Sequence, residues 1–435
     1  MNNPQADRPK RRLSARLALS LTLLVFFLFT FSAGFLTSSL LRATTTTQAA
    51  GTVDFKLLQE SFNLVQDKFV YRDQVDERKM LYGSIVGMLD TLGDEGHTRF
   101  LTPEQLKAEK QSLEGRLEGI GAEVAMKDGR PTIVAPLEGS PAERAGIKAG
   151  DVVLAVNGEE TTHLTLTDTV NRIRGTAGTE VTVQIYRPAT RETIDLKITR
   201  AQVKVRSASW TMLPGSTIGF VRLSSFSENA ESDIKEAVNR LKGQGATGII
   251  VDMRDNPGGL LEQAVRVTSQ FLTKGNVVVQ ADAKGNRKPY GVRAGGIATD
   301  IPVAVLANGG SASSAEIFAG AMQDHQRGPV IGEKTFGTGT VLGMYHLSDG
   351  SAILLGTDQW LTPAGREIRK HGVKPDLEVK LEPTVPRLSP RAAGLLSSEE
   401  LRQHTDLQVL SALHYLETGS LEVFKPVEPA KAPAE

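Results

Sequence analysis

The chain has 435 residues, of which 40% are hydrophobic and 23% charged, so it is long enough for two or three globular domains. Its 50 basic residues balance 50 acidic residues, and this zero net charge gives no reason to expect a nucleic-acid partner. The absence of cysteine excludes disulfides, thiolate metal sites and a cysteine nucleophile. The seven histidines are scattered without close ligand spacing, so we expect no metal and no other cofactor.

Residues 1–16 are polar and basic, whereas residues 17–36 are apolar and carry no charge. About 20 apolar residues suffice to cross a bilayer as a helix, and positive charge before the span favours a cytoplasmic N-terminus. We therefore expect a single-pass anchor in a bacterial-type cell membrane, with the rest of the chain on the extracytoplasmic side. A cleaved signal peptide is the alternative, but its apolar region is usually shorter and ends at an A-x-A-like site.

Residues 37–53 are expected to be a polar linker, and residues 54–115 a helical region. Apolar residues at helical spacing in its first part predict two amphipathic helices. These helices could belong to a core or form a homodimer contact, and the sequence does not distinguish the two. A second helical region is expected over residues 391–424, and the Pro/Ala-rich residues 425–435 are expected to be disordered.

Residues 116–200 contain short strand-like segments, turns and a helical stretch. The phrase SPAERAGIKAGDVVLAVNG runs from Ser140 to Gly158 and resembles PDZ domains. That resemblance implies a groove that takes an extended peptide as an added strand. The backbone N–H groups of a Gly-rich loop, here Gly119, Ile120 and Gly121, would hold a C-terminal carboxylate. A small β domain without a ligand is the alternative.

Residues 201–390 alternate between strand and helix patterns, which is typical of α/β layering. Within them, an apolar run from Ile301 to Ala307 breaks at glycines and continues as a helix after a serine-rich turn. Such a turn can present a nucleophile, because the new helix supplies free N–H groups. Capping of the helix by Ser311 or Ser313 is the plainer interpretation of the same pattern.

Several phrases keep one order along the chain and together resemble the C-terminal processing (tail-specific) serine peptidases over about residues 55–415. The resemblance implies a crotonase/ClpP-like α/β core with an inserted or preceding PDZ domain, and protein substrates that are unfolded or have an exposed C-terminus. The phrases are Gly93 to Pro103, the PDZ phrase, Ile249 to Leu261, Gly310 to Glu316, Gly332 to Gly337, Leu361 to Arg366 and Gly372 to Asp376.

The resemblance makes Ser313 the nucleophile, as the second serine of the Gly-Ser-Ala-Ser phrase. It also implies that the amides of Gly258 and Ser314 hold the developing oxyanion, a contribution of about 3–4 kcal/mol for each donor. Taken alone, the loop around Gly258 would be an ordinary strand-to-helix turn.

The family's general base is a Lys, assisted by a Gln four residues later, but this chain has Thr338 and Leu342 at those positions. Threonine has no basic group near neutral pH, so the base is either relocated or lost. Lys334 is the candidate for a relocated base, although an extended strand would leave it about 13 Å from position 338. Lys370 is not placed by the sequence.

Two other side chains near Ser313 are weaker candidates. His325 lies 12 residues further on the same predicted helix, a rise of about 18 Å. Glu316 is one helical turn away and is expected to have a structural role.

Two functions remain open. The first is a membrane-anchored serine endopeptidase of the C-terminal processing type, which engages its substrates through the PDZ domain. The second is a pseudopeptidase that only binds C-termini, because the usual base and helper are absent. A crotonase-like acyl-CoA enzyme would share only the core fold, and a fold does not carry function by itself.

Overall fold

A computed structural model describes five stretches of the chain, residues 54–94, 97–127, 129–137, 139–382 and 384–424. The chain divides into two compact units, Met1–Met80 and Leu81–Glu435. Helix α2 (Lys56–Lys68) and a short 3-10 turn (Arg72–Gln74) precede α3 (Glu77–Asp90), so helices are present in both expected segments.

No helix within the described stretches is long and apolar enough to cross a membrane. The predicted span 17–36 lies outside them, as do the predicted linker 37–53 and tail 425–435.

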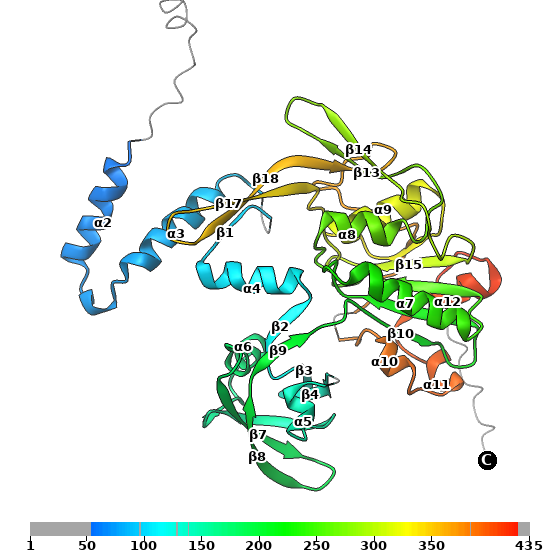
Figure 1. Cartoon of the computed structure of the whole chain (residues 1–435), viewed down its shortest axis with the longest axis horizontal. Helices are drawn as coiled ribbons and strands as arrows, with labels where there is room; N and C mark the ends of the chain where they lie inside the picture. Colours follow the sequence, from blue (N-terminus) through cyan, green and yellow to red (C-terminus); the bar gives the residue numbers. More distant parts are fainter. Residues whose placement is uncertain (1–53, 95–96, 128, 138, 383, 425–435) are drawn as a thin grey trace, which may run out of the picture. The chain divides into compact units, whose positions relative to one another are not determined.

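The domain with the PDZ-like phrase consists of an antiparallel sheet and two short helices (Figure 1). Its strands follow the order β3-β4-β5-β7-β8, so β3 lies at an edge of the sheet, and α6 packs against it. The elements are β3 (Ala122–Lys127), β4 (Arg130–Pro136), α5 (Pro141–Arg144), β5 (Val152–Val156), β6 (Glu159–Glu160), α6 (Leu166–Ile173), β7 (Glu180–Arg187) and β8 (Glu192–Thr199).

The central sheet of the second unit has six strands in the order β10-β11-β12-β15-β16-β19. Only β10 runs antiparallel to its neighbour; the other pairs are parallel and need crossover connections, which α7 and α9 help to supply. The elements are β10 (Ala208–Met212), β11 (Ile218–Leu223), α7 (Ala230–Gly243), β12 (Gly248–Asp252), α8 (Leu261–Thr268), β15 (Val303–Ala307), α9 (Ser314–Asp324), β16 (Val330–Gly332) and β19 (Leu377–Glu378).

Side chains of the central strands point alternately to the two faces of this sheet, and each face has its own core. In β12, Ile249 and Val251 pack in the cluster that contains Phe318 of α9. Ile250 packs on the opposite face in the cluster that contains Leu413 of α12. Burial on both faces explains why β12 reads as a continuous apolar run and confirms the expected α/β layering.

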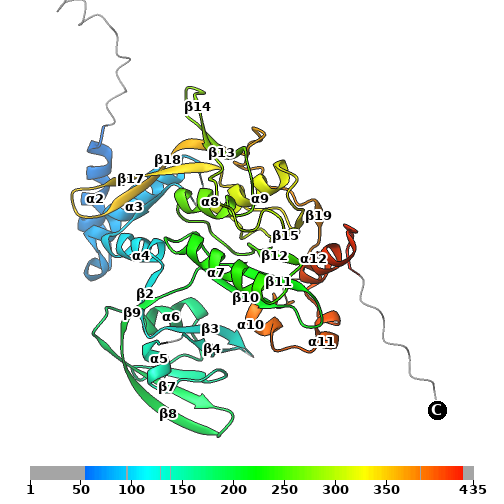
Figure 2. The same ribbon diagram turned by 45° about the vertical axis from the view of Figure 1, so that its right-hand side comes forward.

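A second sheet contains β17 and β18, which run side by side as a long hairpin (Figure 2). Strand β18 also pairs with β1 and β13, and β13 pairs with β14. The elements are β1 (Arg99–Leu101), β13 (Asn276–Ala281), β14 (Arg287–Gly291), β17 (Thr340–His346) and β18 (Ala352–Leu361).

Three further elements flank the PDZ-like domain in the chain. Helix α4 (Pro103–Leu113) and strand β2 (Arg116–Gly119) precede it, and strand β9 (Ala201–Lys204) follows it. Thr102 caps α4 in a capping box with Gln105, and a proline occupies the first turn. Strands β2 and β9 pair antiparallel at the two ends of the PDZ-like domain.

The C-terminal region contains three helices, α10 (Pro390–Ala393), α11 (Ser398–Arg402) and α12 (Leu407–Thr418). Within the helical region expected over residues 391–424, α11 and α12 are separate helices, because Ser397 caps the first and Asp406 caps the second. Asp406 also holds the guanidinium of Arg254, which follows β12 and is fully buried.

Candidate active site

The loops after β12 and β15 meet because these parallel strands are neighbours and end at the same edge of the sheet. Several hydrogen bonds join the loops. The Ala312 amide donates to the Asn256 carbonyl at 2.9 Å, and the Ser311 hydroxyl donates to the Met253 carbonyl at 2.8 Å. The Asp255 amide donates to Asn308 Oδ1 at 2.9 Å. The Pro-Gly-Gly loop and the serine-rich turn are therefore held together by one backbone–backbone hydrogen bond and by the side chains of Ser311 and Asn308.

Ser313 stands at this junction, immediately before α9, with φ 51° and ψ −113°. A non-glycine residue with positive φ costs about 1–3 kcal/mol and persists only where its surroundings enforce it. Here the Ser313 amide donates to Glu316 Oε2 at 2.9 Å and to Thr338 Oγ1 at 2.8 Å. These two acceptors hold the strained turn.

Glu316 is fully buried and braces the segment that passes next to Ser313. Its Oε1 accepts from the Thr335 hydroxyl and the Gly337 amide, both at 2.6 Å. Its Oε2 accepts from Thr338 as well, through the hydroxyl at 2.6 Å and the amide at 3.1 Å. With both oxygens occupied by these donors, Glu316 has the structural role that the sequence predicts.

Thr338 and Leu342 lie where the family resemblance places a base and its helper. The Thr338 hydroxyl bridges Glu316 and the Ser313 amide, so it orders the turn but offers no basic group. Leu342 lines the cavity in front of Ser313 with an apolar side chain.

The proposed oxyanion amides differ from each other in the structure. The Gly258 amide donates to Asn256 Oδ1 at 2.9 Å, so it is occupied within the loop and the expectation for this donor is not met in this conformation. The physical reason is that Asn256 folds back over its own turn. The Ser314 amide, at the first turn of α9, has no partner among the described residues and remains open to an oxyanion.

Gly258 has a second role, because an added Cβ would lie 2.8 Å from the Ser313 Cβ and 2.9 Å from the Ser314 nitrogen. Its φ of 100° also disfavours any other residue. We expect Gly258→Ala to displace Ser313 and lower kcat about 100-fold, since a shift of about 1 Å costs that much. Steady-state kinetics beside circular dichroism would test this, and an Ala variant with unchanged kcat would contradict the close packing.

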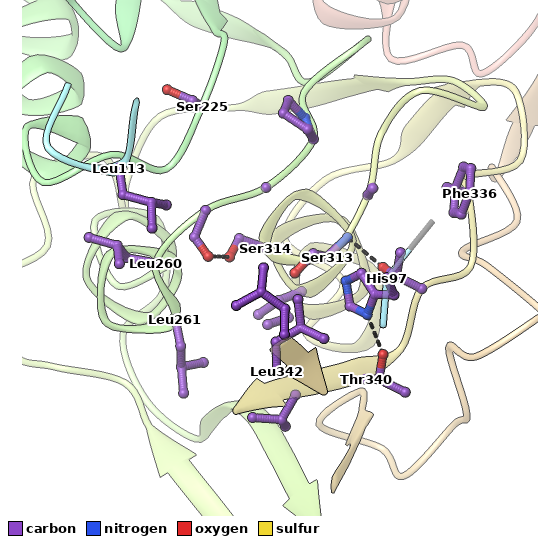
Figure 3. Close-up of a pocket in the computed structure, with 18 of the residues that line it drawn as sticks. His97, Leu113, Ser225, Leu260, Leu261, Ser313, Ser314, Phe336, Thr340 and Leu342 are labelled. Atoms are coloured by element: carbon purple, nitrogen blue, oxygen red, sulfur yellow. Dashed lines mark hydrogen bonds between the residues drawn. The ribbon is translucent and has the colours of Figure 1, made fainter. Parts of the chain in front are cut away.

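Ser313 opens into a cavity of about 740 Å³ (Figure 3). Apart from Arg99 and Glu109, which pair with each other at 2.9 Å, the lining is neutral or carries His97. Its apolar members come from α4, α8, α9, β17, β18 and the loops, and they include Leu113, Leu261, Leu342, Met344, Leu354 and Trp360. A cavity of this size and character fits an apolar peptide segment.

His97 lines the same cavity, although no pattern in the sequence predicts a role for it. Its side chain is buried, and its Nδ1 forms a hydrogen bond with the Thr340 hydroxyl at the start of β17. Burial lowers the pKa of His97, and the charge of Asp94 opposes this only in part. The sequence held one indication, since His97 belongs to the ordered phrase from Gly93 to Pro103. Its distance from Ser313 along the chain gave no reason to place the two side chains together.

The structure does not bring Lys334 to Ser313. Its side chain is exposed and lies outside the residues that line the cavity, so its proposed role as a relocated base is not supported. The assumed extended strand does not exist there, because Gly337 and Gly339 have φ values of 93° and 58° and β17 begins only at Thr340. His325 is also elsewhere, with its Nε2 bonded to the Asn276 carbonyl.

The predicted carboxylate-binding loop lies between β2 and β3. Gly119, Ile120 and Gly121 are buried, and the carbonyls of Ile120 and Gly121 accept from Ala142 and Leu137. Gly121 has φ 73°, and an added Cβ would lie 2.6 Å from the Ser140 Cβ. The loop is thus fixed directly before the edge strand β3, and β3 itself packs against α6.

Comparison with known proteins agrees with this architecture. Peptidase family S41 matches residues 217–379, and a PDZ domain matches residues 132–187. A carboxyl-terminal-processing protease of Synechocystis sp. is 36% identical over 377 residues, which cover 84% of this chain and 85% of that protein. The carboxy-terminal processing protease CtpA of Bacillus subtilis is 36% identical over 334 residues, which cover 77% and 71%.

A solved photosystem II D1 C-terminal processing protease is 31% identical, with a TM-score of 0.46 and coverage of 80% of this chain and 97% of that chain. The sequence matches show that this chain belongs to peptidase family S41, as a serine peptidase of the C-terminal processing type with a PDZ domain. The family predicted from the ordered phrases is thereby confirmed.

Proposed function

We propose that Ser313 is the nucleophile of an endopeptidase that cuts protein chains near their C-termini. One observation carries the proposal: a strained serine stands before the open amide of Ser314, at the mouth of a largely apolar cavity of about 740 Å³. The test is cleavage of an unstructured protein with an apolar C-terminus by the purified chain, compared with Ser313→Ala. Equal cleavage by the two proteins would refute it.

We also propose that the PDZ domain engages the substrate C-terminus. An edge strand beside a helix is the arrangement that adds an extended peptide as a further strand, and the fixed loop Gly119–Gly121 stands at the start of that edge. Amidation of the substrate C-terminus removes its charge without changing its sequence. We expect the KM for the amidated substrate to rise about tenfold; an unchanged KM would mean that the terminal carboxylate is not bound.

Membrane anchoring is a further part of the proposal and depends on residues 17–36 and the basic segment before them. The full chain, produced in bacteria, should stay with membranes after an alkaline carbonate wash, and external protease should digest it in spheroplasts. A chain without residues 1–36 should be released. Recovery of the full chain in the wash would contradict an anchor.

A homodimer through the helical ends also remains a proposal. Helix α2 has no buried residue in the structure and exposes Leu57 and Leu64, which a second copy would cover. Light scattering of residues 54–424 should give twice the chain mass, and Leu57→Glu with Leu64→Glu should give a monomer. A monomer before substitution would refute the dimer.

A pseudopeptidase that binds C-termini is the second candidate function, favoured by Thr338 and Leu342. If the base is lost, Thr338→Lys with Leu342→Gln should raise Ser313-dependent turnover at least about tenfold, because a positioned base contributes about 10²–10⁴-fold. Turnover by the unmodified chain that disappears in Ser313→Ala would rule the pseudopeptidase out.

A further inference from the structure

We propose that His97 is the general base for Ser313, in place of the amine that is absent at position 338. The inference rests on the proposed peptidase function and names the group that activates its nucleophile. It assigns Thr340 as the positioning residue that orients the imidazole.

Two hydrogen bonds, to Thr338 and to Thr340, hold Ser313 and His97 close to the same short segment of chain. The Ser313 amide is bonded to Thr338 Oγ1 at 2.8 Å, and the His97 ring is bonded to Thr340 Oγ1. Positions 338 and 340 are two residues apart, so their Cα atoms can be separated by at most about 7 Å. Both side chains line the same cavity, and Figure 3 shows the His97 ring between Ser313 and Thr340.

The orientation of the ring suits a base. One ring nitrogen, Nδ1, bonds to Thr340, and in Figure 3 the other ring nitrogen lies on the side of Ser313. When Nδ1–H donates to the Thr340 hydroxyl, the lone pair is on Nε2. The structure records no hydrogen bond between Ser313 Oγ and His97, and such bonds often tighten only in the substrate complex.

The elements around His97 hold it in place. Two residues later β1 begins, and its register against β18 is Arg99↔Leu354 and Phe100↔Ile353. The Thr98 hydroxyl donates to Asp94 at 2.7 Å and accepts from the Gly356 amide at 3.0 Å. These two bonds tie the residue next to His97 to the preceding turn and to β18. A base must be positioned by rigid surroundings, and sheet pairing supplies them here.

Burial, together with the charges around it, lowers the pKa of His97 and so leaves the imidazole neutral around pH 7. Burial lowers its pKa most strongly, Asp94 raises it and Arg99 lowers it again. Arg369 pairs with Asp94 at 3.5 Å and weakens that opposing effect. Lys370 lines a neighbouring hollow of about 410 Å³ together with His97. A neutral imidazole is the form that accepts a proton.

Other candidate bases do not share this position. Lys334 is exposed and lies outside the cavity, and Glu316 has both oxygens occupied by structural donors. Lys370 is exposed and lines only the neighbouring hollow, not the cavity that Ser313 opens into. Lys370 is therefore the rival that an experiment must distinguish from His97.

The proton balance of the reaction is complete with one imidazole. Nε2 takes the proton from Ser313 Oγ as this oxygen bonds to the substrate carbonyl carbon. The imidazolium gives that proton to the leaving amine as the C–N bond breaks. Water then attacks the acyl-enzyme and gives its proton to Nε2, which returns it to Ser313 Oγ when the acid product leaves.

The first test is His97→Gln in the full chain, with Lys334→Gln and Lys370→Gln as matched controls that also remove a basic group. We expect His97→Gln to lower kcat about 10²–10⁴-fold with little change in KM, and the two Lys variants to stay within threefold of the unmodified chain. Retained kcat in His97→Gln, or a comparable loss in Lys370→Gln, would overturn the assignment. Circular dichroism and tryptophan fluorescence would establish that each variant is folded.

Two further measurements distinguish a base from a structural residue. As the pH is lowered, kcat/KM of the unmodified chain should begin to fall only below the ordinary histidine pKa of about 6.5. With a lysine base, kcat/KM would already fall between about pH 8 and 7. Thr340→Val should move this acid limb or lower kcat while leaving KM unchanged. An acid limb at pH 7–8 would contradict His97.

Labelling uses the unmodified protein and does not depend on a variant that folds. A peptidyl chloromethyl ketone with an apolar last residue should alkylate His97, located by mass spectrometry of peptides, and Ser313→Ala should slow this reaction. Labelling of Lys370 instead would overturn the proposal. If the unmodified chain shows no Ser313-dependent turnover, the peptidase function itself fails; if turnover survives in His97→Gln, only the assignment of the base fails.

Discussion

Ser313→Ala is expected to reduce turnover by at least about 10⁴-fold. The substitution removes the oxygen that forms the acyl-enzyme, and loss of a nucleophile costs about as much as loss of the whole catalytic group. The backbone should be unchanged, because the Ser313 amide rather than its hydroxyl bonds to Glu316 and Thr338. Binding of substrate should therefore persist.

Ser232→Ala is the matched control for this prediction. Ser232 is on the exposed side of α7, and its hydroxyl donates only to the Asn229 carbonyl, at 2.8 Å. We expect its turnover to equal that of the unmodified chain. Release of product over time, followed by mass spectrometry, measures both variants. Turnover in Ser313→Ala within tenfold of the unmodified chain would show that another group attacks the peptide.

Asp406→Ala is expected to lower the free energy of unfolding by about 3–5 kcal/mol, because it leaves several buried donors without their acceptor, at about 1–3 kcal/mol for each, although Arg254 keeps Asp252. Arg254 is fully buried and donates to both oxygens of Asp406, at 3.0 and 2.8 Å, and also to Asp252. Burial alone would lower the pKa of Arg254, but the two carboxylates raise it, so the guanidinium stays charged. Asp406 also accepts from the Leu388 amide at 2.9 Å.

Urea unfolding followed by tryptophan fluorescence measures this effect, because Trp210 and Trp360 both lie in sheets of the second unit. Asp300→Ala is the control: Asp300 pairs with Lys242 at 2.7 Å on the exposed surface, so its loss should shift the midpoint little. Equal midpoints for the two variants would mean that the buried ion pair does not hold α12 to the sheet.

Local patterns were informative where the chemistry lies within one stretch of chain. The apolar run from Ile301 to Ala307 contains strand β15, and the serine-rich turn after it starts α9, because both depend on neighbouring residues only. The same reasoning failed for Lys334, where two glycines with positive φ replace the expected strand. It also missed that Asn256 occupies the Gly258 amide, which depends on how one side chain folds back.

The sequence by itself determined the family, the position of the serine phrase and the fact that Thr338 cannot act as a base. Each of these follows from residue identity and order, which do not change on folding. Only the tertiary structure decided which basic group lies in the cavity with Ser313. His97 comes there because β1 pairs with β18, β18 with β17, and β17 begins at Thr340. Sheet pairing joins residues that are far apart in the chain, and no spacing along the sequence records it.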